Sequence, residues 1–249
     1  MFKVGIDIGS TSCKAVVLKD GEIIHKILKP TGWSSKEVAY TVKEELELMG
    51  INADNSYYVS TGYGRVSVPF ANKKVTEITC HGVGAAHLFG NDGVVLDIGG
   101  QDTKVITIEN SKVSDFLMND KCSAGTGRFL EVMANILGLS IDELSKLSMN
   151  GKGVSISSMC TVFAESEVIS LIGAGTKKED IAYGVLDSIA SKVKGICHRH
   201  NKTDKYFLTG GLCENTYFID MLSKKLEAQI ITSPHGRYAG AIGAAILAK

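Results

Sequence analysis

The sequence predicts an α/β protein of two related subdomains, because it carries a duplicated strand–turn–strand segment and alternates strands with helices. Two segments match each other, KVGIDIGSTSCKAVVL at 3–18 and GVVLDIGGQDTKVITI at 93–108. Each has DIG, then a loop, and a lysine seven positions after the aspartate. Apolar runs rich in β-branched residues flank both loops, which is typical of a hairpin. Copies this far apart indicate two similar subdomains rather than a solenoid of short repeats.

The elements of the first half follow from the spacing of apolar residues. Val38, Val42 and Leu46 recur at helical spacing and predict an amphipathic helix. Short β-rich runs before and after it predict strands. In order, the predicted elements are a hairpin over 3–18, a strand near Glu22–Leu28, a helix near Ser35–Met49 and a strand at Tyr57–Thr61.

The second half repeats this plan and adds helices. In order, the predicted elements are strands near 94–98, 103–109 and 112–118, helices near 125–137 and 140–148, a strand at Tyr206–Thr209, a helix near 215–227, a strand at Gln229–Thr232 and a helix at Tyr238–Ala248. Strands that lead and helices that cover them are typical of an α/β architecture.

The duplication also predicts where the chain divides. We expect residues 1–85 plus 236–249 to form subdomain I and residues 86–235 to form subdomain II, with the last helix crossing back. Only three prolines occur and no low-complexity segment is present, so the subdomains are expected to join without a flexible linker. A hinge is predicted near His81–Gly90.

Composition narrows the classes of function. Lys plus Arg and Asp plus Glu are both 27, so the 249-residue chain has no net charge, and no basic stretch tracks a phosphodiester backbone. Nucleic acid is therefore not expected as a partner. No apolar run reaches the roughly 20 residues of a membrane span, and the first residues enter a strand pattern at once, so no membrane association and a cytoplasmic location are expected. The six cysteines include no CxxC pair and are not expected to form disulfides.

The two DIG loops have the composition of phosphate-binding loops. Glycine lets the backbone approach a ligand closely, and successive N–H groups can form a nest for phosphate oxygens. The candidate ligand-binding residues are Gly9, Ser10, Thr11, Ser12 and Lys14 in the first loop, and Gly99, Gly100, Gln101, Asp102 and Thr103 in the second. Lys14 and Lys104 either neutralise phosphate charge or are simply exposed.

Two aspartates stand at the strand ends that lead into these loops. A carboxylate beside phosphates can hold Mg²⁺, usually through water, so Asp7 and Asp97 are candidate catalytic residues. Taken singly, either loop also fits an ordinary Asp-Gly hairpin turn. The occurrence of two matching loops favours the nucleotide interpretation.

The pair of loops resembles the actin, hexokinase and heat-shock chaperone superfamily of ATPases. That resemblance implies two ribonuclease H-like subdomains around an ATP cleft, with both loops at the phosphates of MgATP. The superfamily also has a Gly-Gly turn that holds adenosine, and TGGLCEN at 209–215 stands in the corresponding place. By this resemblance Gly210, Gly211 and Asn215 bind the nucleotide, although TGG is otherwise an ordinary strand-to-helix turn that favours an anion.

A further catalytic carboxylate is implied by the same resemblance. FAESEVISL at 163–171 is similar to the interdomain helix of the superfamily, whose acidic residue reaches Mg²⁺ or the attacking water, and Glu165 is the matching residue. The alternative is that Glu165 and Glu167 are solvated acids in the first turn of a helix, where the helix dipole stabilises them. Gln101 could likewise orient the water, because phosphoryl transfer depends on positioning.

Two cysteines stand out by their surroundings. Cys122, in NDKCSAGTGRF, and Cys160, in SSMCTVFAESEV, are each expected at or just before a helix start, where the dipole favours a thiolate that can bind iron. The alternative is that each is a small buried hydrophobic residue. A 4Fe-4S cluster needs about four cysteine ligands, which a two-fold dimer can supply from two per chain.

These two segments resemble the ATP-dependent activators (component A) of 2-hydroxyacyl-CoA dehydratases, the BadF/BadG/BcrA/BcrD ATPases, a family that includes ATPase subunits of benzoyl-CoA reductase. The resemblance implies a homodimer that shares one 4Fe-4S cluster through Cys122 and Cys160. It also implies a low-potential electron passed from reduced ferredoxin or flavodoxin to an iron–sulfur dehydratase or reductase component, at the expense of ATP. Cys13, Cys80, Cys197 and Cys213 match no cluster motif and are expected to be structural.

Two rival hypotheses remain at this point. The first is a small-molecule kinase of the same fold, of the N-acetylglucosamine type, although the chain has little room for the insertions that shape a sugar pocket. The second is a non-enzymatic, nucleotide-gated scaffold, which would leave Cys122 and Cys160 unexplained.

Overall fold

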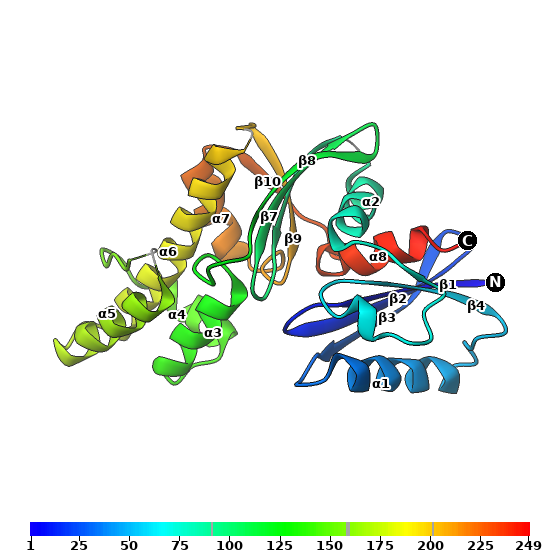
Figure 1. Cartoon of the computed structure of the whole chain (residues 1–249). Coiled ribbons are helices and arrows are strands. Elements are labelled where there is room, and N and C mark those ends of the chain that lie inside the picture. The colour runs from blue at the N-terminus through cyan, green and yellow to red at the C-terminus, as the bar shows by residue number, and fades with distance from the viewer. Residues whose placement is uncertain (91, 158–159, 201) are drawn as a thin grey trace. The chain divides into compact units, whose positions relative to one another are not determined.

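The computed structural model describes residues 1–90, 92–157, 160–200 and 202–249 (Figure 1). The chain forms two compact units. Unit 1 comprises residues 1–95, 106–115 and 233–249, and unit 2 comprises residues 96–105 and 116–232. These limits differ from the expected division at 85/86 and 235/236, since residues 86–95, 106–115 and 233–235 belong to unit 1.

The first sheet lies in unit 1 and has the strand order β3-β2-β1-β4-β5. Its first three strands form an antiparallel meander, while β4 and β5 pair in parallel with their neighbours. These strands are β1 (Phe2–Ile8), β2 (Ser12–Lys19), β3 (Glu22–Pro30), β4 (Ser56–Thr61) and β5 (Lys73–Lys74). One face packs against the apolar side of α1 (Ser35–Leu48), as the helical spacing predicted.

The second sheet has the strand order β10-β9-β6-β7-β8. Read from β8 to β10, this order repeats that of the first sheet. The strands are β6 (Gly93–Ile98), β7 (Thr103–Glu109), β8 (Lys112–Asn119), β9 (Lys205–Gly210) and β10 (Gln229–Ile231). β6 corresponds to β1, β7 to β2, β8 to β3, β9 to β4 and β10 to β5. The duplication predicted from the DIG segments is therefore confirmed at the level of topology.

Two glycine-rich helices cover the other face of the first sheet. They are α2 (Glu77–Phe89) and α8 (Ala239–Ile246), which follows the 3-10 turn Gly236–Tyr238. A Cβ on Gly84 would overlap the carbonyl oxygen of Ala239, and one on Gly243 would overlap that of Cys80. A Cβ on Gly5 in β1 would overlap the carbonyl oxygen of Ala241. The two helices and the strand thus touch backbone to backbone, which only glycine permits.

The predicted hinge near His81–Gly90 is wrong, because these residues form most of α2 inside unit 1. Their glycines serve close helix packing rather than flexibility. A Cβ on Gly82 would overlap the side chain of Val113, and Gly84 packs against α8 as described above. The helix was missed because its small residues give no broad apolar stripe.

The helices of unit 2 include one long helix that the sequence did not predict. α6 (Lys178–Arg199) has 22 residues and a continuous buried side that includes Val185, Ile189 and Val193. The other helices of this unit are α3 (Gly127–Ile136), α4 (Ile141–Ser148), α5 (Thr161–Gly173) and α7 (Thr216–Leu226). Among the described residues, no helix has both the length and the apolar character needed to cross a membrane.

The contact of α2 with α8 generates a prediction about stability. Gly243→Ala is expected to lower the free energy of unfolding by about 3 kcal/mol, because the new methyl group meets the backbone of α2 and cannot move aside. The measurement is the urea midpoint. Gly195→Ala in α6 is the control, because nothing lies within 4 Å of a Cβ there, so alanine's helix propensity should leave stability equal or higher. An equal midpoint for Gly243→Ala would contradict the close packing.

Candidate functional site

Loop 1 (residues 9–12) joins β1 to β2 in unit 1. The Gly9 N–H donates to the carbonyl of Ser12 at 3.1 Å, which closes the turn. The Thr31 hydroxyl donates to the Gly9 carbonyl at 2.7 Å and its N–H donates to the Thr11 carbonyl at 3.0 Å. The loop is therefore held by its carbonyl groups. Its hydroxyls remain accessible, since Ser10 and Ser12 are half-buried and Thr11 is exposed.

Asp7, at the end of β1, is only 3% exposed and lies in a cradle of glycines. A Cβ on Gly62, whose φ is +83°, would overlap Asp7 Oδ1, and a Cβ on Gly240 would crowd Asp7 Oδ2. His81 Nε2 lies 3.9 Å from both Asp7 Oδ2 and Glu77 Oε1. His81 and Glu77 on α2 were not predicted as site residues, since no motif in the sequence connects them with Asp7.

Loop 2 (residues 99–102) joins β6 to β7 and repeats the turn of loop 1. The Gly99 N–H donates to the Asp102 carbonyl at 2.9 Å. The first turn of α3 attaches to this loop, because the N–H groups of Gly127 and Arg128 donate to the carbonyls of Gly99 and Gly100 at 2.9 and 2.7 Å. These two N–H groups are therefore already hydrogen-bonded to the loop. The side chain of Gln101 is exposed, as a residue that orients a ligand would be.

Asp97, at the end of β6, is 2% exposed and has a donor at each carboxylate oxygen. The Thr209 hydroxyl donates to Oδ1 at 2.9 Å. Lys104 Nζ lies 3.4 Å from Oδ2 and 2.8 Å from Asp102 Oδ2. Lys104 is 1% exposed, so of the two alternatives for this lysine, the one in which it is simply exposed is wrong. Lys14, its counterpart after loop 1, is half-buried.

The TGG turn lies against loop 2 within unit 2. The Gly211 N–H donates to the Ile98 carbonyl at 3.1 Å, and a Cβ on Gly210, whose φ is +86°, would overlap that carbonyl. Asn215 is the N-cap of α7. Its Oδ1 accepts from the Phe218 N–H at 3.0 Å and its Nδ2 donates to Ser145 at 2.7 Å. The glycines thus lie beside the loop, whereas the polar atoms of Asn215 cap a helix.

Cys122 and Cys160 belong to segments that contact each other in unit 2. Both are half-buried. Cys160 is the N-cap of α5, as expected, but α3 begins only at Gly127, five positions after Cys122, so the dipole argument does not apply to Cys122. The residue after each cysteine joins the segments, because the hydroxyls of Ser123 and Thr161 are 2.8 Å apart and share a hydrogen bond. Ser158 and Met159 of the SSMC motif lie outside the described residues.

The other four cysteines are buried, as expected of structural residues. All six cysteines are free thiols. Burial, with the nearby Asp7 carboxylate, raises the pKa of Cys13 to about 12. Burial likewise raises the pKa of Cys80 to about 11 and that of Cys197 to about 12. A thiol that stays protonated at neutral pH is a poor iron ligand, because thiolates bind metals.

Glu165 lies on α5, half-buried, in the second turn of the helix. Neither Glu165 nor Glu167 is a first-turn acid, so that alternative is wrong. Glu167 instead accepts from the Ser157 N–H at 2.8 Å and holds the segment before α5. In the described part of unit 2, no hydrogen bond or ion pair joins Glu165 to loop 2.

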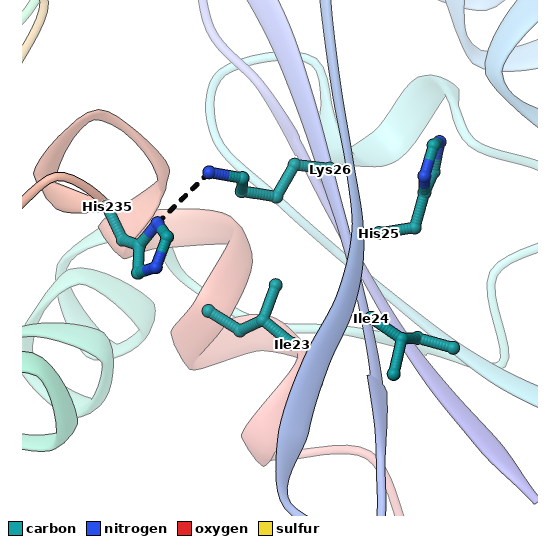
Figure 2. A pocket seen from close by; sticks show the side chains of 5 residues that line it. All are labelled: Ile23, Ile24, His25, Lys26 and His235. Carbon is teal, nitrogen blue, oxygen red and sulfur yellow. Dashed lines mark hydrogen bonds between the residues drawn. The ribbon is translucent and has the colours of Figure 1, made fainter.

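A shallow, open pocket of 360 Å³ lies at the outer strand of the first sheet (Figure 2). Its lining residues are Ile23, Ile24, His25, Lys26 and His235, none of which was predicted as a site residue. Lys26 Nζ donates to His235 Nδ1 at 3.1 Å, in line with a neutral imidazole, because burial and the nearby Lys26 charge lower the pKa of His235. Loops 1 and 2 contribute no residue to this pocket.

The chain matches a known protein family over almost its whole length. The model of the BadF/BadG/BcrA/BcrD ATPase family matches residues 4–248. The chain belongs to this family. It is 45% identical over 252 residues to the (R)-2-hydroxyglutaryl-CoA dehydratase activating ATPase of Acidaminococcus fermentans, with 100% of this chain and 97% of the relative covered. The predicted family and its ATPase chemistry are confirmed.

Solved structures of this family have the same fold. The A. fermentans (R)-2-hydroxyglutaryl-CoA dehydratase component A matches with a TM-score of 0.93 and 44% identity, over 100% of this chain and 97% of that one. The Clostridium difficile activator of 2-hydroxyisocaproyl-CoA dehydratase, solved with bound ADPNP, matches with a TM-score of 0.92 and 38% identity, over 100% and 94%. A sugar kinase of Streptomyces griseus, at 13% identity and a TM-score of 0.61, shares the fold alone. The predicted actin-like ATPase fold is confirmed.

The exposure of the thiols generates a prediction. In metal-free native protein at about pH 8.5, iodoacetamide should label Cys122 and Cys160 at least ten times faster than the other four cysteines, because those four are buried and the raised pKa keeps three of them, Cys13, Cys80 and Cys197, protonated. Peptide mass spectrometry measures the rates. Labelling in about 6 M guanidinium is the control and should reach all six. Rapid native labelling of Cys13 or Cys197 would contradict the assignment of these cysteines as structural.

Proposed function

We propose that this chain is an ATP-hydrolysing iron–sulfur activator, which drives a low-potential electron into a 2-hydroxyacyl-CoA dehydratase or a related acyl-CoA reductase. The single observation that carries the proposal is the hydrogen bond between Ser123 and Thr161, at 2.8 Å. It joins the segments of the two accessible cysteines within the unit that also carries loop 2 and the TGG turn. The family relatives described above are named as activators of such dehydratases.

The accessible cysteines fit an iron–sulfur cluster. Cys122 and Cys160 are half-buried and stand beside the joined residues Ser123 and Thr161, whereas the other four are buried. Two ligands per chain are half of the set that a 4Fe-4S cluster needs, so Cys122 and Cys160 from two chains would hold one cluster. When bound, the cluster would accept and release a single electron at low potential.

Surface composition supports the homodimer that this ligand count requires. α5, which begins after Cys160, keeps several large apolar side chains exposed: Val162 at 65%, Phe163 at 62%, Ile169 at 54% and Ile172 at 46%. Exposed apolar side chains on one helix are typical of surfaces that bind other chains. We infer that α5 contacts the second subunit or the iron–sulfur partner enzyme. Reduced ferredoxin or flavodoxin is the proposed electron donor, and the assembly is proposed to work in the cytoplasm.

MgATP is the proposed nucleotide, and each loop has its own donors for phosphate. In loop 1 these are the N–H groups and hydroxyls of Ser10, Thr11 and Ser12, with Lys14 as the cation. In loop 2 they are the N–H groups of Gly100, Gln101 and Asp102 and the side-chain amide of Gln101. The Gly99 N–H and the Thr103 hydroxyl, which were also candidates, are already donated to the carbonyls of Asp102 and Gly125. Asp7 and Asp97 would hold Mg²⁺ through water. Gly210 and Gly211 would contact adenosine, with Asn215 fixing the helix behind them, and Gln101 or Glu165 would orient the attacking water.

A continuous set of hydrogen bonds runs from loop 2 to the cysteine segments. The Thr103 hydroxyl donates to the Gly125 carbonyl at 2.7 Å. The Thr126 hydroxyl and N–H donate to the Ser123 carbonyl at 2.6 and 3.1 Å, and Ser123 bonds to Thr161. We infer that the state of the nucleotide at loop 2 reaches Cys122 and Cys160 through this segment. Glu165 does not take part in this connection, since no interaction joins it to loop 2 among the described residues.

The activator hypothesis accounts for more of the structure than its two rivals. A sugar kinase or a nucleotide-gated scaffold would use the loops but would leave the paired cysteine segments without a role. The likeness to a sugar kinase at 13% identity concerns the fold alone.

The first experiment measures iron and electron transfer. Anaerobically purified protein should be brown and contain about four Fe per two chains, and it should pass electrons to the dehydratase encoded beside it only with MgATP. Cys122→Ser and Cys160→Ser should each remove the iron, because two chains would then supply only half of the ligands. ADP binding measured by calorimetry should be retained in both variants.

Cys213→Ala is the matched control for this experiment, because Cys213 is buried and is not a proposed iron ligand. This variant should keep the full complement of iron. Full iron content in Cys122→Ser or Cys160→Ser, or a complete cluster in a monomer, would rule out the shared site. A colourless wild-type protein that hydrolyses ATP would favour the rival hypotheses.

The second experiment tests the link between loop 2 and the cysteines. If nucleotide and redox state are coupled, ATP binds the oxidised and the reduced protein with affinities that differ by about fivefold or more. Ser123→Ala and Thr161→Val remove the hydroxyl pair, so this difference should shrink in both variants while the iron content stays constant. Ser166→Ala, a serine on the exposed side of α5, is the control and should leave the difference unchanged. Equal affinities in wild-type protein would refute the coupling.

A further inference from the structure

The two lysines of the duplicated loops have different surroundings. Lys14 and Lys104 occupy the same position, seven residues after Asp7 and Asp97. Lys14 Nζ lies beside loop 1, 3.7 Å from where a Cβ of Gly9 would be, and among the described residues it forms no ion pair. Lys104 is 1% exposed, and its Nζ lies between two carboxylates. The two lysines therefore occupy equivalent positions in the sequence but differ in burial and in their ion pairs.

Two contacts of Lys104 lead to groups that shape loop 2. Its Nζ is 2.8 Å from Asp102 Oδ2, and Asp102 ends the loop, where its carbonyl closes the turn to Gly99. The same Nζ is 3.4 Å from Asp97 Oδ2, and the Thr209 hydroxyl donates to Asp97 Oδ1 at 2.9 Å. One donor stands at each oxygen of Asp97, so the plane of this carboxylate is set from both sides.

Burial makes this arrangement rigid. A buried ammonium is stable only when carboxylates compensate its charge, and a buried carboxylate needs hydrogen-bond donors. Asp97 is 2% exposed, whereas the side chain of Asp102 is 26% exposed. Lys104 thus bridges the buried carboxylate of Asp97 and the partly exposed carboxylate of Asp102, which ends loop 2.

We propose that Lys104 is a positioning residue for ATP hydrolysis, which acts with Thr209 to hold the Asp97 carboxylate in the orientation needed for Mg²⁺, while Lys14 is the lysine that binds phosphate. This inference rests on the proposed role of Asp97. Lys104 acts through Asp97 and Asp102 and does not touch the nucleotide. Its loss should affect the catalytic step and the Mg²⁺ requirement more than nucleotide binding.

The test is steady-state MgATP hydrolysis by the full-length protein, with Mg²⁺ varied at fixed ATP. Lys104→Met keeps the length of the side chain and removes the charge. It should lower kcat about tenfold or more and raise the Mg²⁺ concentration for half-maximal activity, with the KM for ATP within about threefold of wild type, because a misplaced carboxylate mainly impairs the reacting geometry. Lys14→Met, the matched variant, should raise the KM for ATP at least as strongly as it lowers kcat.

A second variant separates positioning from charge balance. Lys104→Met/Asp102→Asn restores the net charge around Asp97, so it should recover the thermal stability of the wild type. Asp102→Asn alone is the control, because Asp102 itself belongs to loop 2. A kcat of the folded double variant well below that of Asp102→Asn supports positioning, and an equal kcat would overturn it. If neither Lys104 variant folds, Thr209→Val decides: a lower kcat with an unchanged KM supports the proposal, and an unchanged kcat overturns it.

Asp97→Asn distinguishes failure of this inference from failure of the proposed site. Undiminished hydrolysis in Asp97→Asn would refute the role of Asp97 itself, and the inference with it. A strong loss in Asp97→Asn together with wild-type kcat and Mg²⁺ dependence in Lys104→Met would overturn the role of Lys104 alone.

Discussion

A nearly fully buried carboxylate at the end of a central strand is the constraint on which each unit depends. A carboxylate without compensation in a protein interior costs several kcal/mol, so the surrounding groups must supply donors or positive charge. In unit 2, Lys104 and Thr209 do so for Asp97. In unit 1, Asp7 lies between close-packed glycines with His81 nearby. The duplicated aspartate is thus held by different neighbours in the two copies.

The glycines of α2 and α8 connect packing with the site in unit 1. Because Gly84 and Gly243 allow backbone contact, the two helices approach closely enough to bring His81 and Gly240 against Asp7. Any side chain at these two glycines would separate α2 from α8. The density of this packing explains why a glycine-rich segment forms a helix here, although glycine in a helix interior costs up to about 1 kcal/mol.

In unit 2, loop 2 and the segments that carry Cys122 and Cys160 are connected by a short stretch of backbone. The start of α3 donates to loop 2, and the residues just before it accept from Thr103 and connect through Ser123 to α5. An element that is hydrogen-bonded at both ends responds as a unit when either end moves. This arrangement gives the proposed link between ATP and the cluster a physical basis, and it does not involve Glu165.

The sequence by itself determined the duplication, the two loops, the family and most helix and strand positions, because these depend on periodicity and on short motifs. Only the tertiary structure decided that Lys104 is buried, that α2 is a helix rather than a hinge, and that Ser123 bonds to Thr161. Those outcomes depend on groups far apart along the chain, 38 positions for Ser123 and Thr161 and 112 for Asp97 and Thr209. No local sequence pattern identifies such partners, because the packing of whole helices and strands brings them together.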